Sequence, residues 1–247
     1  MDRWLKGDRS ARTGPQVEVQ DSDQRWRTEQ KWPPVQNTRQ RTLYMSADGT
    51  FTQQPTGPTA TATLGPSSRN RYFYLNNQQG VYNELPIDRI CTACATFTYD
   101  VRGGDLRIVG TPTLGLRLVP RGPSGHVAAF LLRVDRDDGW HLIGWGASDL
   151  RFPRGGYEAQ PVTPGEPVKM TLPLQPLDAV VHDGEQLLLI LDQGHADHFP
   201  GLPFFPVDLE YGSTLGTLEL TRQTPRRRQF FEPPPVGERW CGDACGT

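Results

Sequence analysis

The stretch VAAFLLRVD at residues 127–135 is followed by Asp138-Gly139 and then by LIGWGASDL at residues 142–150. Both flanking runs are largely apolar. An Asp-Gly pair between two such runs is a strong signal for a tight turn in a β-hairpin. This stretch therefore predicts two antiparallel strands in the middle of the chain.

Similar short runs continue on both sides of this hairpin, separated by Gly, Pro or Asp-Gly. With 26 Gly and 23 Pro among 247 residues, the composition suits short strands and turns. No window from 95 to 220 predicts an amphipathic helix. Regularly spaced short strands predict an all-β sandwich or barrel. Besides the hairpin, we expect strands at 17–20, 42–46, 95–99, 106–109, 113–119, 168–174, 186–192 and 217–220.

Alternation within the strands also predicts which side chains are buried. The strands at 113–119, 127–135 and 186–192 are expected to be central. Successive side chains of a strand point to opposite faces, so every second residue should face the interior. On this basis the expected interior side chains are Leu116, Phe130, Leu132, Leu188 and Ile190.

The chain divides into three parts. Residues 1–41 are expected to form a short helix end, which Gly7 would cap, then a linker and the first strand. Residues 42–222 are expected to form the sandwich, with 52–70 as an exposed loop. Residues 223–247 form an expected irregular tail that carries Arg226–Arg228 and three prolines.

Charge and hydropathy exclude two classes of protein. A net charge of −2 argues against nucleic-acid binding through phosphate attraction. No stretch approaches the roughly 18 apolar residues of a membrane span. The first residues also lack the apolar run of a secretory signal, so none is expected here.

Two cysteine pairs are the most chemically distinctive feature: Cys91 and Cys94, then Cys241 and Cys245. Four thiolates in two close pairs can form a tetrahedral structural zinc site. The same residues can form disulfides in an oxidising compartment, or remain free thiols. We expect the two pairs to lie close together, as a zinc site or as disulfides. Bridged cysteines would favour an extracytoplasmic location, whereas a zinc site would leave the compartment open.

A second polar cluster lies in a loop at Asp192, His195, Asp197 and His198. It suggests either a metal site or a polar loop at the edge of a sheet. Three other histidines adjoin turns and are expected to be solvated: His126, His141 and His182. The segment 135–139 has some calcium-loop character, but it lacks the later ligands, and a hairpin turn explains it better.

Four aromatic residues lie along the central hairpin and the loop after it: Trp140, Trp145, Phe152 and Tyr157. They would serve as core or interdomain packing if buried, or as a platform for sugar rings if exposed. Trp145 lies between two glycines of a strand, so we expect it in the core.

The sequence shows no serine in a nucleophile elbow. That motif, Gly-x-Ser-x-Gly, belongs at a turn from a strand to a helix. Ser148 and Ser213 come nearest to it, and both lie inside or beside expected strands. A catalytic serine in this chain is therefore not expected.

Several ordered stretches resemble one family. The first are DRWLKG (2–7), TGPQVEVQ (13–20), RWRTE (25–29), WPP (32–34) and TLYMSADG (42–49). VGTPTLGL (109–116), AAFLLRVD (128–135), PGEPV (164–168), LPL (172–174) and HDGEQLLL (182–189) follow in order. Together they resemble the C-terminal domain of the X-Pro dipeptidyl-peptidase and cocaine-esterase group of serine hydrolases, over roughly residues 1–220.

The resemblance implies a jelly-roll β-sandwich of the galactose-binding-like type that packs on a preceding α/β-hydrolase domain. The family's catalytic triad lies in that domain, so this chain would act on peptide or ester substrates only through it, in cis or as a separate chain. The resemblance also implies that Met1 falls near the helix leading out of the hydrolase domain. The alternatives are a free-standing carbohydrate-binding module and a protein-interaction module. No cofactor is expected apart from the zinc considered above.

Overall fold

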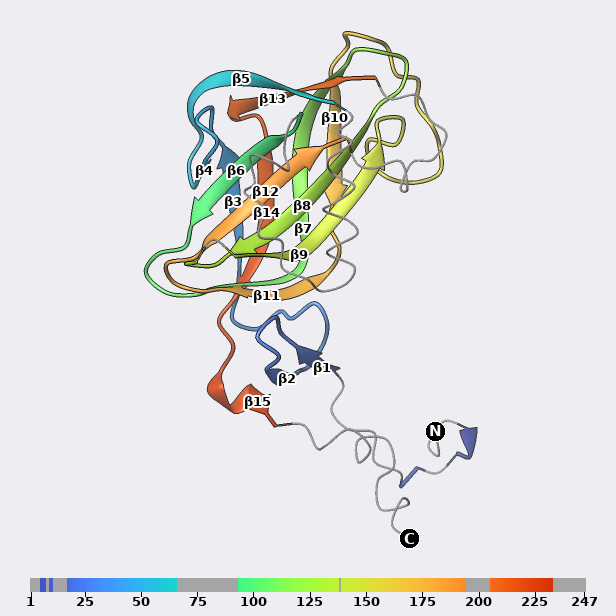
Figure 1. The fold of residues 1–247 in the computed structure, drawn as a ribbon. Coiled ribbons are helices and arrows are strands. Elements are labelled where there is room, and N and C mark those ends of the chain that lie inside the picture. The colour runs from blue at the N-terminus through green and yellow to red at the C-terminus, as the bar shows by residue number, and fades with distance from the viewer. Residues whose placement is uncertain are drawn as a thin grey trace.

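The computed structural model describes residues 5–7, 9–10, 17–65, 93–137, 139–193 and 205–232. These residues form three antiparallel β-sheets and one short 3-10 helix, η1 (Arg227–Gln229). The predicted all-β sandwich is confirmed (Figure 1). The strands are β1 (Val17–Gln20), β2 (Trp26–Glu29), β3 (Thr38–Met45), β4 (Phe51–Thr52), β5 (Thr56–Leu64), β6 (Ala95–Asp100), β7 (Leu106–Pro120), β8 (His126–Val134), β9 (Trp140–Asp149), β10 (Val168–Pro173), β11 (Leu177–Val181), β12 (Gln186–Asp192), β13 (Val207–Ser213), β14 (Thr217–Gln223) and β15 (Phe230–Phe231).

Two of the sheets form the sandwich. The smaller has the strand order β6-β12-β8-β9. The larger follows the path β4-β3-β14-β7-β13-β5, and β10 and β11 also pair with β7. With 15 residues, β7 is the longest strand and pairs with β10, β11, β13 and β14. A third sheet, with the order β1-β2-β15, extends from the lower end of the sandwich in Figure 1. We call this third sheet the N-terminal ladder.

The core lies between the two large sheets. Alternation along β12 turns Leu187, Leu189 and Leu191 toward this interior, where they join Leu131 of β8 and Leu116 of β7. The prediction that Leu116 faces the interior is confirmed. Burial of such side chains is the main force that holds the two sheets together.

The four-stranded sheet also buries apolar side chains on its opposite face. Phe130 pairs with Trp145 of β9 and with Ile190 of β12, and Leu132 pairs with Leu142 and Leu188. The second buried cluster comprises Ala128, Phe130, Leu132, Val134, Trp140, Leu188 and Ile190. We call this second cluster the outer cluster. The predicted alternation along β8 and β12 is therefore correct, but the residues predicted to face the other sheet of the sandwich lie in the outer cluster instead. Period-two alternation separates two sets of side chains and cannot tell which set faces the other sheet when both are apolar.

Six of the observed strands are not predicted from the sequence: β2, β4, β5, β11, β13 and β15. β5 lies within the stretch 52–70 that is expected to be an exposed loop. The expected strands at 106–109 and 113–119 form one continuous strand, β7. β5 alternates Thr with Ala and has Leu64 as its single fully buried apolar residue, so it carries little hydrophobic signal. Among the described residues it pairs with β13 alone, and an edge position tolerates its Pro58.

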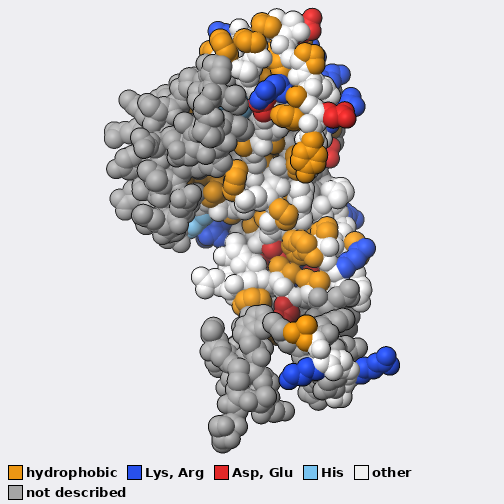
Figure 2. Space-filling view, turned by 90° about the vertical axis from the view of Figure 1, so that its right-hand side faces the viewer, with side chains coloured by type: hydrophobic (Ala, Val, Ile, Leu, Met, Phe, Trp, Pro, Cys, Tyr) orange, Lys and Arg blue, Asp and Glu red, His pale blue; other side chains and the backbone are white. Residues whose placement is uncertain are grey.

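No helix among the described residues is long and apolar enough to span a membrane. Viewed from the side (Figure 2), hydrophobic side chains reach the surface both on the sandwich and lower down, interspersed with charged ones.

Candidate functional site

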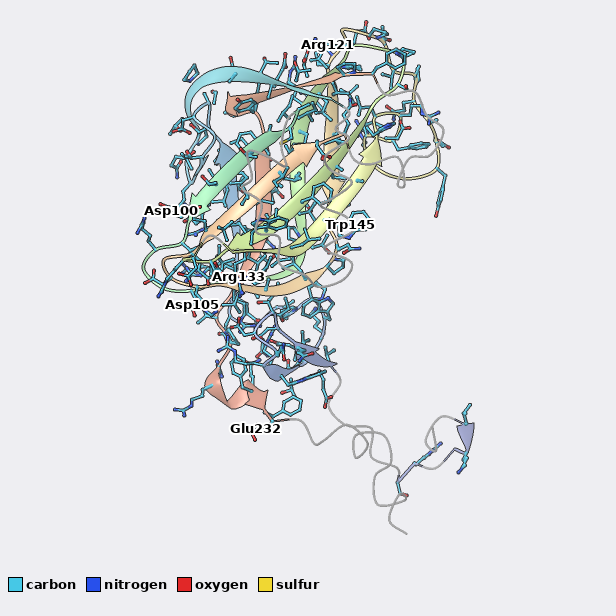
Figure 3. The ribbon with its side chains drawn as sticks, viewed as in Figure 1. Asp100, Asp105, Arg121, Arg133, Trp145 and Glu232 are labelled. Atoms are coloured by element: carbon cyan, nitrogen blue, oxygen red, sulfur yellow. The ribbon has the colours of Figure 1, made fainter. Side chains whose placement is uncertain are left out.

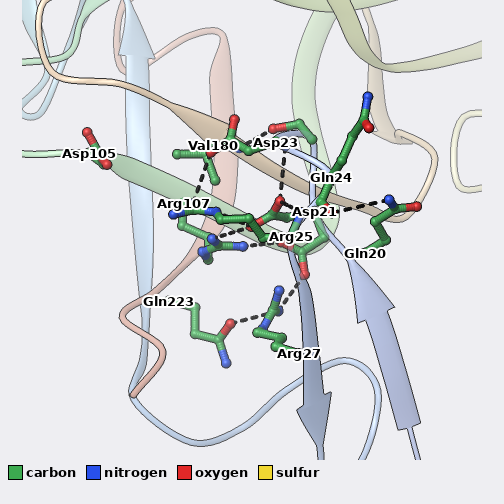
Figure 4. Close-up of polar contacts among 12 residues, drawn as sticks. Gln20, Asp21, Asp23, Gln24, Arg25, Arg27, Asp105, Arg107, Val180 and Gln223 are labelled. Carbon is green, nitrogen blue, oxygen red and sulfur yellow. Dashed lines mark hydrogen bonds and ion pairs between the residues drawn. The ribbon is translucent and has the colours of Figure 1, made fainter. Parts of the chain in front are cut away.

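The N-terminal ladder is joined to the sandwich by a buried network of charged side chains (Figure 4). The network centres on Arg27 of β2 and Arg107 of β7, which both reach Asp178 of β11. We call it the ionic joint. Backbone contacts support it: the Ser22 N–H donates to the Asp178 carbonyl at 3.0 Å, and the Val180 N–H donates to Ser22 Oγ at 2.9 Å. The turn after β1 thus covers the edge of β11.

Arg27 is the largest fully buried side chain of the described residues, at 0% exposure. Its Nε donates to Glu29 Oε1 at 2.8 Å, and its Nη2 donates to Gln223 Oε1 at 2.9 Å and pairs with Asp178. Burial lowers the pKa of Arg27, but the hydrogen bonds and charges of Asp178 and Glu29 outweigh it and raise the pKa. The guanidinium therefore stays charged in the interior, where an unpaired charge would be very costly.

Arg107 connects the same carboxylate to the first turn of the chain. Its Nη1 donates to Asp178 Oδ1 at 2.8 Å, and its Nη2 donates to Asp21 Oδ2 at 2.6 Å. Burial raises the pKa of Asp21, but hydrogen bonds from Arg107 and from the Arg25 backbone N–H, with the charges of both arginines, lower it below its ordinary value. Asp21 is therefore ionised at neutral pH.

A second, more exposed polar group lies beside the ionic joint. His182 Nε2 is 3.2 Å from Asp23 Oδ1, and His182 Nδ1 is 3.4 Å from Asp105 Oδ2. Arg133 of β8 also approaches Asp23, at 3.4 Å. Figure 3 shows Arg133 and Asp105 at this lower end of the sandwich, above Glu232 on the ladder. These contacts connect the β1–β2 turn to both sheets of the sandwich.

The ladder also carries a groove of about 480 Å³. It is lined by residues of the turn after β1, of β2, of η1 and of β15. The rings of Trp26 and Phe231 are 6.5 Å apart and tilted by 51°. The lining residues are Gln24, Arg25, Trp26, Arg227, Phe230, Phe231 and Glu232. The start of the expected irregular tail therefore forms ordered structure that builds this groove.

The cysteine predictions fall mostly outside the described residues. Cys94 takes part in a disulfide and packs against the outer cluster of the four-stranded sheet. Cys91, Cys241 and Cys245 lie outside the described residues. The expected closeness of the two pairs stays a prediction. In the part of the chain that the structure describes, no group of three or more His, Cys, Asp or Glu side chains could hold a metal ion.

The loop cluster is likewise only partly described. Asp192 is buried at the end of β12, whereas His195, Asp197 and His198 lie outside the described residues. The structure therefore does not test whether these side chains form a metal site.

The other histidines differ in burial. The prediction that His126 is solvated is wrong, because its side chain is fully buried at the start of β8, and burial lowers its pKa. His141 is mostly buried and lies 3.2 Å from Asp135. Asp135 Oδ1 accepts a hydrogen bond from the Gly139 N–H at 2.7 Å, as expected for a hairpin turn rather than a calcium loop.

The aromatic residues of the central hairpin do not form an exposed platform. Trp140 is 5% exposed and belongs to the outer cluster, and Trp145 packs beside it. Phe152 is half-buried, and only Tyr157 is fully exposed. Trp145 was expected in the core and lies instead on the outer face of the four-stranded sheet.

The two serines nearest to a nucleophile motif lie in antiparallel strands. Ser148 is in β9 and Ser213 ends β13, and a turn follows each of them. A nucleophile elbow needs a strand that leads into a helix. These two positions therefore lack the geometry that exposes a catalytic serine.

The ionic joint is the feature that the sequence predictions missed. Alternation in Trp26-Arg27-Thr28-Glu29 places Arg27 and Glu29 on one face of a strand, which is a visible signal. Nothing in the sequence signals that this face meets Asp178, because the two segments are about 150 residues apart and pair only through the fold.

Comparison with known proteins identifies the fold. A family model described as the X-Pro dipeptidyl-peptidase C-terminal non-catalytic domain matches residues 10–229. No curated protein matches the chain.

Three solved structures share the fold at low sequence identity. They are an aminopeptidase from a marine sediment Thaumarchaeota archaeon (TM-score 0.68, 12% identity, 90% of this chain and 43% of that one), a CocE/NonD family hydrolase from Staphylococcus aureus (0.65, 15%, 89% and 44%) and an alpha-amino acid ester hydrolase (0.69, 14%, 90% and 43%). The chain spans less than half the length of each of these relatives. The resemblance seen in the sequence is confirmed: the chain belongs to the family of X-Pro dipeptidyl-peptidase C-terminal non-catalytic domains.

Proposed function

We propose that this chain is the C-terminal accessory domain of an α/β-hydrolase that acts as an X-Pro dipeptidyl-peptidase or as an acyl esterase. In this role it packs on the catalytic domain, shapes access to the active site and has no activity alone. The family match over residues 10–229, to a domain described as C-terminal and non-catalytic, carries the proposal. The lengths of the solved relatives support it, because more than half of each lies outside the shared fold.

The physical task of such a domain is to cover one side of a substrate entrance. Closure excludes water and restricts which acyl groups reach the nucleophile. A rigid joint between the ladder and the sandwich suits this task, since a cover that moved freely would not hold a defined entrance. The buried ion pairs of the ionic joint support a fixed connection of this kind.

Activity measurements on the purified chain test the proposal that it has no activity alone. We expect no turnover of an Xaa-Pro-arylamide or of a simple aryl ester above background, and no labelling by a fluorophosphonate probe. Turnover that disappears when one serine of this chain is replaced by alanine would overturn the proposal.

Addition of the α/β-hydrolase polypeptide encoded with this chain tests the proposal that the chain packs on the catalytic domain and shapes access to the active site. We expect the two polypeptides to bind, and kcat/KM for peptide or ester substrates to change when the complex forms. A hydrolase whose kcat/KM is the same with and without this chain would contradict a role in substrate access.

The alternative of a free-standing carbohydrate-binding module has less support. It requires an exposed aromatic platform near Trp140 and Tyr157, and Trp140 is buried. A single exposed tyrosine offers much less stacking area than a platform. The protein-interaction alternative differs from the main proposal only in the identity of the partner.

We also propose that the four cysteines act together at one place. The disulfide at Cys94 supports bridging over zinc for that residue. Non-reducing peptide mass spectrometry identifies which of Cys91, Cys241 and Cys245 is bonded to it, and metal analysis of the purified protein measures zinc. A bond within the first pair, together with free thiols at Cys241 and Cys245 and no zinc, would contradict a shared role.

A further inference from the structure

We propose that two copies of this chain associate through strand β5, which pairs antiparallel with β5 of the second copy. Such a dimer is separate from the packing on a hydrolase domain, so its failure would leave the accessory function standing. Three properties of this strand support it: an edge position, an absence of charge and a symmetric sequence.

β5 lies at one end of the large sheet. The sheet follows the path β4-β3-β14-β7-β13-β5, and among the described residues β5 pairs with β13 alone. Figure 1 shows β5 at the upper margin of the sandwich, beside β13. An edge strand presents backbone N–H and C=O groups with which another strand can pair. β5 is therefore a template for one further strand.

β5 lacks the charged side chains that usually protect such an edge. Proteins block exposed edges with charges, prolines, bulges or very short strands. Among the described strands with a single pairing neighbour, β4 and β15 have only two residues each. The others apart from β5 each carry a charged residue: Glu18 in β1, Asp100 in β6, Asp149 in β9, Lys169 in β10 and Asp178 in β11. β5 has nine residues, TGPTATATL, and no charge.

A proline and a β-bulge protect only the first part of β5. Pro58 has no N–H to offer, and the register with β13 shifts between Tyr211 and Ser213. From Ala60 to Leu64 the pairing with β13 is regular. This pairing fixes the second part of β5 as an extended strand before a partner arrives, which reduces the entropy cost of binding.

The sequence of this second part indicates that the partner is another copy of β5. Residues 59–63 read Thr-Ala-Thr-Ala-Thr, which is the same in both directions. Antiparallel pairing about a twofold axis at Thr61 places Thr59 opposite the partner's Thr63, Ala60 opposite the partner's Ala62, and Thr61 opposite the partner's Thr61. Thr–Thr pairs across antiparallel strands are favourable. A twofold dimer needs a self-complementary surface of this kind.

The two faces of residues 59–63 suit a sheet that continues across the axis. The three threonines are exposed, both alanines are half-buried, and Ala62 packs against the sandwich core. Directly opposed residues share a face. The pairing therefore joins threonines on the solvent face and alanines on the face toward the core, and it brings no like charges together.

The geometry also limits the assembly to a dimer. Twofold pairing uses the β5 edge of both copies, and the two-residue strand β4 then lies at each end of the merged path. Twofold contacts are closed, so no further copy is added at β5. A contact of about five residues a side is small beside the roughly 20–30 residues a side of a standard interface, so the dimer should be weak and concentration-dependent.

Sedimentation velocity of the intact chain tests the dimer, at concentrations from about 1 µM to 1 mM, the range of weak association. Two variants probe the axis: Thr61→Lys and Thr61→Glu each place a charge directly opposite its own copy. The matched controls are Thr171→Lys and Thr171→Glu, at an exposed position of β10. Far-UV circular dichroism and Tm check that each variant folds.

We expect the wild type to pass from monomer to dimer within this range. Each Thr61 variant alone should raise the dimer Kd by about tenfold or more, because like charges directly opposite each other repel. This loss should shrink as salt rises. The controls should change Kd by less than about twofold. An equimolar mixture of Thr61→Lys and Thr61→Glu should recover at least the wild-type affinity, because the charges at the axis are then of opposite sign.

Three results would overturn the proposal. A wild type that stays monomeric throughout would exclude the dimer and leave the edge of β5 to a strand of a different protein. Thr61 variants that dimerise as the wild type does would place the contact elsewhere on the molecule. Loss of the dimer in both variants without recovery in the mixture would exclude the twofold axis at Thr61.

Discussion

Asp21 Oδ2 lies 2.6 Å from Nη2 of Arg107 and thereby joins the first turn of the ladder to the longest strand of the sandwich. Both side chains are buried. This charged contact joins segments about 90 residues apart in the sequence. It holds the ladder to the sandwich only while Asp21 and Arg107 are both ionised. The stability of this joint therefore depends on each of its charges and on pH.

Replacement of Arg27 by Met should destabilise the protein strongly. The change leaves Glu29 and Asp178 as buried carboxylates without their shared cation, and breaking a buried ion pair in this way costs about 3–5 kcal/mol. Urea unfolding at neutral pH measures the loss. The control is Arg121→Gln, which breaks a pair with Asp208 whose arginine side chain is 54% exposed. It should cost about 0–1 kcal/mol, and a similar loss in both variants would contradict the special role of the joint.

The pH dependence of stability should contain a contribution from Asp21. Its pKa is lowered in the folded protein, so the ionised carboxylate stabilises the fold above the unfolded value of about 3.9. That contribution is lost as the pH falls through the folded pKa. Between pH 6 and pH 3 the wild type should therefore lose more free energy of unfolding than Asp21→Asn does.

The comparison isolates one group, because the other titrating carboxylates are common to both proteins. Glu158→Gln, an exposed change, serves as the control and should follow the wild type. Parallel curves for wild type and Asp21→Asn would show that Asp21 does not contribute to the acid sensitivity.

Both faces of β12 should be sensitive to truncation. Leu189 faces the sandwich interior and Leu188 faces the outer cluster, and both are buried. Replacement of either by Ala should cost about 2–5 kcal/mol, because each change leaves a cavity. Thr171→Ala, at an exposed position of β10, should stay within about 0.5 kcal/mol. Denaturant unfolding measures the free energy of unfolding of each variant. An unchanged value for Leu188→Ala would mean that the outer cluster contributes little to stability.

A glycine in β13 should not tolerate a side chain. Gly212 has φ +89°, and a Cβ there would lie 2.2 Å from the Pro58 carbonyl oxygen of β5. Gly103 also has a positive φ, +79°, but its Cβ would meet nothing within 4 Å. Gly103→Ala should therefore cost only the backbone term of about 1–2 kcal/mol, and Gly212→Ala clearly more. Equal shifts in Tm would show that β5 moves away without cost.

Local signals in the sequence are enough to predict the class of fold. Asp138-Gly139 between two apolar runs and the short strands spaced by Gly and Pro carry local signals, because turn chemistry and alternation depend on near neighbours in the chain. β5 is not predicted, because its alternation of Thr with Ala gives little difference in hydrophobicity between the two faces of the strand. In β12 the alternation separated Leu188 from Leu189, but both faces of the strand are apolar.

Which of those two leucines faces the other sheet depends on how the two sheets stack. The same stacking brings Arg27, Arg107, Asp21 and Asp178 together. Local sequence can place Arg27 and Glu29 on one face of a strand. It cannot say that this face meets β7 and β11, because charge pairing over such separations follows from the way the sheets stack. The groove on the ladder has the same origin, since its lining residues come from segments about 200 residues apart in the sequence, which meet only in the folded protein.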